Sequence, residues 1–216
     1  DRDTQLAELA GASIHIAHVS TEKSVEIIRN AKKKGIRVTA EAAPHHFTLK
    51  DEDLRTYDTN LKVNPPLCSA EDIEALKKGL KDGTIDAIAT DHAPHLENEK
   101  EKEFDYAPSG MIGLETALSL SAMELVEKGY LDWPGLIKKM STNPCQILGY
   151  ERGTLKQGAV ADIVIIDPEK EWVYEKKQIK SLSSNSPFIG RKMKAGVTDV
   201  IVGGRVVVRE GAILDA

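Results

Sequence analysis

The chain has 216 residues, of which 41% are hydrophobic, and its formal net charge is −5. This acidic balance argues against a nucleic-acid-binding surface, which would be basic, and no apolar run approaches the ~20 residues that a membrane-spanning helix needs. The two cysteines, Cys68 and Cys145, have neither metal-binding nor redox spacing. They favour a reducing, cytoplasmic location.

Alternating strand and helix patterns fill the first two thirds of the chain. Residues 1–11, DRDTQLAELAG, predict the tail of a helix with Leu6 and Leu9 on one face and Gly11 as its end. The predicted strands that follow are 12–19, 36–43 and 84–90. Helices are predicted after each strand: from Ser20 or Thr21 to Gly35, from the Ser69 capping box to Gly83, and over 113–129.

This order predicts βα units and a parallel sheet, with a small β domain after it. We expect a domain boundary near Gly149, giving domains over 1–149 and 150–216. The second domain holds about four or five strands and needs a partner to be stable. Gly203-Gly204, between two Val-rich runs, indicates a hairpin.

Polar side chains gather where the predicted parallel strands end. His18, the pair His45 and His46, and Asp91 each follow a strand. The carboxyl ends of parallel strands form the catalytic face of a (β/α)₈ barrel and also the ligand edge of a doubly wound sheet. Position alone therefore leaves both architectures open.

The segment ATDHAPH, 89–95, places Asp91, His92 and His95 after an apolar strand. A buried carboxylate costs several kcal/mol unless it is paired, and a metal ion is one partner that these residue types favour. A long loop follows, and loops of this length tend to be functional. We expect His95 to reach a substrate anion and His92 to brace the loop, whereas the charged run 97–103 is expected to be a solvated flank.

Each of these residues also has an ordinary structural interpretation. His18 on its own fits a core histidine bonded to a backbone carbonyl, and at most one of His45 and His46 is expected to enter the site. Asn64, in KVNPPL, has the donor and acceptor to bind a substrate amide, but asparagine before proline is also common in turns. His15 has the opposite pleat parity to His18, so we expect it to face the helices.

Taken together, the motifs resemble one family. IHIAHVST, VTAEAAPHHF, KVNPPL, ATDHAPH, APSGMIGLETALSL and GTLKQGAVADIVIID occur in this order and cover nearly the whole chain. The set is similar to the C-terminal half of the dihydroorotases of the amidohydrolase superfamily. HVST alone is shared with allantoinases and hydantoinases, and Cys68 stands where the family usually has a basic residue.

The resemblance implies the C-terminal part of a (β/α)₈ TIM barrel with part of a small β-sandwich, and it implies roles for single residues. His18 and Asp91 would bind Zn²⁺, of which the family holds one or two ions, and Asp91 would also take a proton from the attacking water. Asn64, His95, Pro108 and Gly110 would contact the substrate. The implied reaction is the reversible closure of N-carbamoyl-L-aspartate to L-dihydroorotate, a step of pyrimidine (UMP) synthesis.

The resemblance also implies partners. A complete barrel needs eight strands and ~250 residues, so we expect this chain to be a fragment that is inactive alone and completed by the N-terminal half of the same protein. A homo-oligomer is expected, and aspartate transcarbamoylase is a candidate partner for it. Loop 96–110 is expected to be mobile without substrate.

Three other interpretations remain open. The chain resembles allantoinases and dihydropyrimidinases in part, and these hydrolyse other cyclic amides. A non-catalytic dihydroorotase-like subunit that scaffolds aspartate transcarbamoylase would share the fold, although the presence of both His18 and Asp91 argues against it. A doubly wound binding protein would carry a glycine-rich phosphate loop after a strand, and none of the three predicted strands has one.

Overall fold

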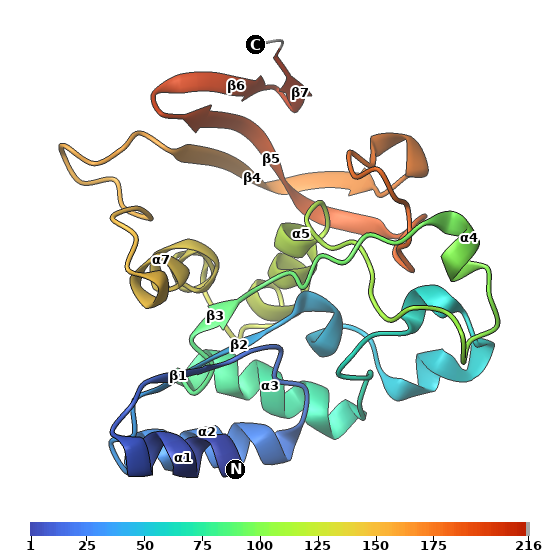
Figure 1. Cartoon of the computed structure of the whole chain (residues 1–216). Coiled ribbons are helices and arrows are strands. Elements are labelled where there is room, and N and C mark those ends of the chain that lie inside the picture. Colours follow the sequence, from blue (N-terminus) through green and yellow to red (C-terminus); the bar gives the residue numbers. More distant parts are fainter. Residues whose placement is uncertain (215–216) are drawn as a thin grey trace.

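The computed structural model describes residues 1–214 and contains two sheets joined by helices (Figure 1). The elements up to Gly149 are α1 (Arg2–Ala10), β1 (Ile14–Ile16), α2 (Glu22–Lys33), β2 (Val38–Ala42), η1 (Pro44–Phe47), η2 (Asp51–Thr56), η3 (Thr59–Leu61), α3 (Ala70–Asp82), β3 (Ala87–Ile88), α4 (Glu97–Lys100), α5 (Ala117–Ser121), η4 (Ala122–Val126), α6 (Trp133–Ile137), η5 (Lys138–Thr142) and α7 (Asn143–Leu148). They are followed by β4 (Ile163–Val173), η6 (Lys176–Gln178), β5 (Lys192–Val202), β6 (Arg205–Arg209) and β7 (Ala212–Ile213).

The first sheet is parallel, with the order β1-β2-β3, which confirms the predicted βα units. In β2, Val38, Ala40 and Ala42 are buried and alternate with partly exposed residues, because one face of the strand packs against helices. That face meets the apolar sides of α2 and α3 in the main core, where Leu76 and Leu80 have no exposed surface.

Local sequence signals fix both helices that cover this sheet. The Thr21 side chain caps α2 by accepting from the Ser24 amide, and Val25, Ile28 and Ala31 form its buried face. Ser69 and Asp72 form the predicted capping box of α3. Gly83 ends α3 in the left-handed region, which glycine enters without a Cβ penalty.

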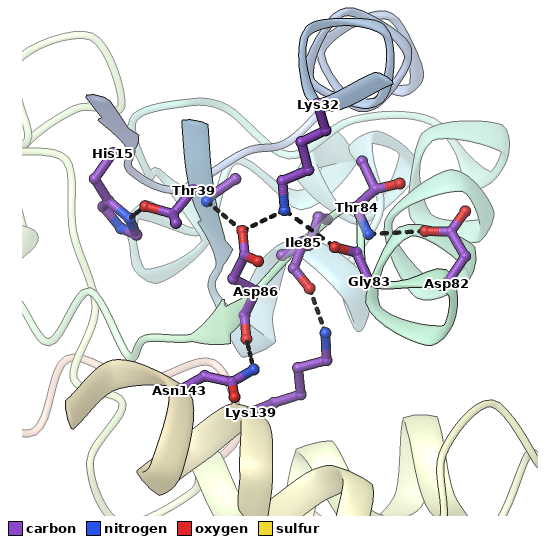
Figure 2. A network of polar contacts seen from close by, with 11 residues as sticks. His15, Lys32, Thr39, Asp82, Gly83, Thr84, Ile85, Asp86, Lys139 and Asn143 are labelled. Carbon is purple, nitrogen blue, oxygen red and sulfur yellow. Dashed lines mark hydrogen bonds and ion pairs between the residues drawn. The ribbon is translucent and has the colours of Figure 1, made fainter. Parts of the chain in front are cut away.

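A polar network holds the amino-terminal edge of the parallel sheet, opposite the strand ends that carry the candidate site (Figure 2). Asp86, just before β3, accepts from Lys32 Nζ at 2.6 Å and from the Ala40 amide at 2.9 Å. Its carbonyl oxygen accepts from Asn143 Nδ2 at 2.7 Å, and Lys139 Nζ donates to the Ile85 carbonyl at 2.5 Å. These contacts tie α2, β2, η5 and α7 to the residues just before β3.

The second sheet is antiparallel, with the order β4-β5-β6-β7, and Gly203 and Gly204 form the predicted hairpin turn between β5 and β6. Helix α5 lies between the two sheets (Figure 1). The Ala195 carbonyl of β5 accepts from both Ser119 Oγ of α5, at 2.7 Å, and Trp172 Nε1 of β4, at 3.0 Å. The antiparallel sheet is therefore bonded to the helix layer.

Helix α1 ends at Gly11 as predicted; in it Thr4 and Ala7 are buried, and Leu6 and Leu9 are 54% and 86% exposed. The expectation for His15 was wrong. His15 does not face the helices: its neighbours Ile14 and Ile16 pack against the main core, and His15 Nδ1 bonds to Thr39 Oγ1 on the opposite face, at 2.8 Å.

Within residues 1–214, no helix combines the length and the apolar character that crossing a bilayer requires.

The main core gives a direct test of the packing. Leu76 of α3 is completely buried, so Leu76→Ala removes apolar contacts and leaves a cavity. We expect the free energy of unfolding to fall by about 2–5 kcal/mol. The matched control is Leu182→Ala, because Leu182 is fully exposed and surface changes stay within about 0.5 kcal/mol. Urea denaturation of both variants measures the difference, and equal losses would contradict the assigned core.

Candidate active site at the strand ends

Two residues of the site adopt strained backbone conformations directly after parallel strands. His18 follows β1 with φ 37°, and Asp91 follows β3 with φ 48°. Left-handed conformations are uncommon for residues other than glycine, cost of order 1–3 kcal/mol, and cluster at functional sites. The chain after His18 is fixed because the Val19 amide donates to the Glu41 carbonyl at 2.8 Å.

Two buried imidazoles lie near His18. His45 and His46 lie in η1, immediately after β2, with 3% and 2% of their surface exposed and their ring centroids 4.2 Å apart. Among the described residues, His18 Nδ1, His45 Nε2 and His46 Nδ1 are buried without a hydrogen-bond partner. Burial, and then the neighbouring His46 and His18 rings, lowers the pKa of His45 to about 3.

His46 connects this cluster to the loop that carries Asn64. Its Nε2 donates to the Pro65 carbonyl at 2.8 Å, which leaves Nδ1 as the free acceptor. Burial lowers the pKa of His46, while the Pro65 bond and the negative charge of Asp91 oppose that shift. Asn64 itself is exposed, and no hydrogen bond from its side chain exists within residues 1–214.

The segment after Asp91 brings the other predicted substrate contacts together. His92 braces it as predicted, because its Nδ1 accepts from the Gly113 amide at 3.1 Å. His95 Nε2 donates to the Ser109 carbonyl at 3.0 Å. Gly110 lies against His95: at φ 135°, a Cβ atom there would come within 2.9 Å of His95 Nε2.

Backbone bonds also place this segment beside the Asn64 loop. The Gly110 amide donates to the Lys62 carbonyl at 2.8 Å, two residues before Asn64. Lys100 Nζ donates to the carbonyl oxygens of both Pro108 and Gly110, at 2.9 and 3.1 Å. The fold therefore groups His95, Pro108 and Gly110, and it joins them to the loop that carries Asn64.

Lys100 corrects the expectation that the run 97–103 is only a solvated flank. Its side chain is buried, with 6% of the residue exposed. Burial lowers its pKa from 10.5 to about 8, and nearby Lys62 adds to that effect while Asp58 opposes it. No sequence signal indicates this burial, because a lysine among glutamates has no pattern that marks it as buried.

Loop 96–110 is held by several polar contacts. Lys62 Nζ donates to the Phe104 and Asp105 carbonyls at 2.7 and 3.0 Å. Thr59 Oγ1 donates to the Lys100 carbonyl. These contacts limit how far the loop can open, and its mobility without substrate stays a prediction.

The cluster at the strand ends offers two of the predicted metal ligands. His18 contributes an unpartnered, buried Nδ1. Asp91 is exposed, so the expectation of a buried carboxylate was wrong, and its carboxylate has no hydrogen bond or ion pair within residues 1–214. Over the same residues, no group of three or more His, Cys, Asp or Glu side chains is arranged to hold a metal ion.

Comparison with known proteins decides the family. The sequence model of the Amidohydrolase family matches residues 4–207. The chain belongs to this family. Its amidohydrolase fold is of the TIM-barrel type, and the three parallel βα units are part of that barrel.

Two curated relatives of this amidohydrolase chain are dihydroorotases. It is 58% identical to a dihydroorotase of Geobacter sp. (strain M21) over 97% of this chain and 49% of that protein. It is 59% identical to a dihydroorotase of Citrifermentans bemidjiense over 95% of this chain and 48% of that protein. The chain spans about half the length of the curated relatives it matches.

Solved hydantoinase structures show the same fold. An L-hydantoinase (dihydropyrimidinase) from Arthrobacter aurescens superposes with a TM-score of 0.93 at 32% identity. The match covers 99% of this chain and 49% of that one. A D-hydantoinase superposes with a TM-score of 0.90 at 30% identity, over 98% of this chain and 48% of the other.

The lowered pKa of Lys100 predicts a pH dependence of stability. Between about pH 8 and 10.5 the unfolded chain binds more protons at this residue than the folded chain does. The free energy of unfolding therefore gains a contribution as the pH rises through this window. Lys100→Met removes that contribution, so we expect stability to rise less with pH than in the wild type.

Urea denaturation at several pH values in the same window measures this slope. Lys102→Met is the matched control, because Lys102 is exposed and its loss leaves the slope unchanged. Identical slopes in the wild type and Lys100→Met would contradict a buried, shifted lysine.

Proposed function

We propose that the protein containing this chain is a dihydroorotase, which interconverts L-dihydroorotate and N-carbamoyl-L-aspartate by zinc-dependent hydrolysis of the cyclic amide. The observation that carries the proposal is the 58% identity to a dihydroorotase over 97% of this chain. The strand-end positions of His18 and Asp91 support it, because both side chains have free ligand atoms there.

The residues present fit a zinc ion. An imidazole nitrogen and a carboxylate oxygen are both common zinc ligands, and a buried nitrogen without a partner is costly unless something binds it. His18 and Asp91 are the two ligands that this chain would contribute. The remaining ligands, and whether one or two ions bind, belong to the rest of the protein in this proposal.

When bound, zinc supplies a Lewis acid that polarises the amide carbonyl and makes water more acidic. Asp91 then acts as the general base and accepts the proton of the attacking water. As the C–N bond breaks, the protonated Asp91 passes this proton to the departing ring nitrogen. In the reverse direction it takes the proton from that nitrogen and returns it to the departing water. Asp91 suits this role because its carboxylate has no protein partner within residues 1–214 that competes for the proton.

Substrate binding falls to the loops around the strand ends. The exposed Asn64 amide can donate to and accept from the cyclic amide, and the backbone at Pro108 and Gly110 lines the ring. His95 binds the substrate carboxylate. Its Nε2–H donates to the Ser109 carbonyl in this structure, so the carboxylate must replace that acceptor.

The other expected partners belong to the same proposal. They are the N-terminal half of the protein, further copies of it in a homo-oligomer, and aspartate transcarbamoylase, with the cytoplasm as the location. The hydantoinase named in the structural comparison makes a dihydropyrimidinase activity the second candidate, because it superposes with a TM-score of 0.93.

The test is hydrolysis by the full-length, zinc-loaded protein of dihydroorotate, dihydrouracil and hydantoin. We expect the highest kcat/KM with dihydroorotate. Preference for either of the other two substrates would favour the second candidate, and no turnover of any of them would favour a scaffolding subunit.

Removal of the proposed base gives a sharper outcome. Asp91→Asn should lower kcat by at least about 10²-fold, the lower end of what general-base catalysis contributes. Asp199→Asn is the matched control, because this carboxylate lies in β5 of the antiparallel sheet, and it should leave kcat unchanged. Full activity of Asp91→Asn would contradict the assigned role.

A further inference from the structure

Asn185 connects the antiparallel part of the chain to the loop beside the candidate site. It lies between β4 and β5, in the stretch 179–189, and is only 5% exposed. Its backbone carbonyl accepts from the Ile112 amide at 3.0 Å. Nearby, Glu115 Oε1 accepts from the Lys180 and Ser181 amides, both at 3.1 Å, which docks the stretch 179–189 onto the same region.

The side chain of Asn185 makes hydrogen bonds to both sides of that loop. Its Nδ2 donates to the Ala93 carbonyl at 2.9 Å and to the Gly110 carbonyl at 3.2 Å. Its Oδ1 accepts from the His95 amide at 3.2 Å. Among the neutral side chains, only an amide supplies two donors and an acceptor from one planar group, so asparagine matches this set of partners.

These bonds fix the distance between His95 and Gly110. Residues 93–95 form one side of the loop and residues 110–112 the other, and Asn185 bonds to both. The Gly110 carbonyl is held from two directions, by Asn185 Nδ2 and by Lys100 Nζ at 3.1 Å. Because a Cβ at Gly110 would already clash with Ala93 at 2.6 Å, the packing tolerates little displacement.

We propose that Asn185 is a positioning residue for substrate binding: it holds His95 and Gly110 at the spacing that the substrate requires. This rests on the proposed function, in which His95 and Gly110 contact dihydroorotate. The stretch between β4 and β5 thus contributes to the binding site without touching the substrate. Losing Asn185 weakens the binding of substrate more than it slows the chemistry at Asp91.

The variants Asn185→Ala and Asn185→Asp test this in the full-length, zinc-loaded protein. We expect both to raise KM for dihydroorotate at least about tenfold, as the loss of a buried hydrogen bond predicts, with kcat within about twofold of the wild type. The matched control is Asn143→Ala. Asn143 also bonds a buried carbonyl, that of Asp86, but at the opposite edge of the sheet, and its loss should lower stability and leave KM unchanged.

Asn185→Asp adds a second measurement, the pH dependence of KM, which a purely structural role of Asn185 would not change. Its carboxylate keeps the acceptor for the His95 amide but faces two carbonyl oxygens without a donor. Protonation restores one donor, so the ratio of the variant's KM to that of the wild type should fall as the pH is lowered. A ratio that does not change with pH, or a KM equal to that of the wild type, overturns the proposal.

Hydrogen exchange separates this proposal from the proposed function. Loss of Asn185 should increase exchange of amides in residues 92–112 and leave β2 and α3 unchanged. If the wild type does not hydrolyse dihydroorotate, the proposed function fails and exchange alone decides the role of Asn185 in holding the loop. Unchanged protection of residues 92–112 in both variants overturns it.

Discussion

The alignment of β1, β2 and β3 is the constraint on which the site depends. In a parallel ladder all carboxyl ends meet at one edge, so the residues that follow these strands converge. His18 follows β1, the His45–His46 pair follows β2, and Asp91 follows β3. The positive φ values of His18 and Asp91 turn the backbone sharply at this edge, and the parallel sheet and its helices hold the two residues in these conformations.

A second group of contacts positions the loops that lie next to that edge. The buried Lys100 ammonium and the Asn185 amide both bond to the Gly110 carbonyl, one from the loop itself and one from beyond β4. Neither group is placed to act on a substrate. Their effect is to hold the Gly110 carbonyl, at a point where Gly110 packs against His95. The stretch between β4 and β5 therefore contacts the strand-end loop through the buried Asn185 side chain and through the bond from the Ile112 amide to the Asn185 carbonyl.

Much of this architecture could be predicted from sequence because its signals are local. The Thr21 cap, the Ser69–Asp72 capping box and the Gly83 stop each act within a few residues, and the helices they bound were predicted closely. The parallel order followed from the alternation of strands and helices. The strand-end positions of His18 and Asp91 followed from the same pattern.

The errors arose where the outcome depends on distant contacts. The predicted strands 12–19 and 84–90 shorten to Ile14–Ile16 and Ala87–Ile88, because a strand extends only as far as its neighbour pairs with it. His15 was assigned to the wrong face because its parity was counted from His18, whose left-handed backbone breaks the alternation. Lys100 and Asn185 are recognised only through partners 10 and 75 residues away in sequence at Gly110.

The central claim is that His18 and Asp91 bind one metal ion at the carboxyl edge of the parallel strands. A crystal of the zinc-loaded, full-length protein, measured at the zinc absorption edge, tests it directly. The account predicts an anomalous peak about 2.0–2.2 Å from an imidazole nitrogen of His18 and from a carboxylate oxygen of Asp91. A zinc peak that contacts neither residue, in a protein that hydrolyses dihydroorotate, would contradict it.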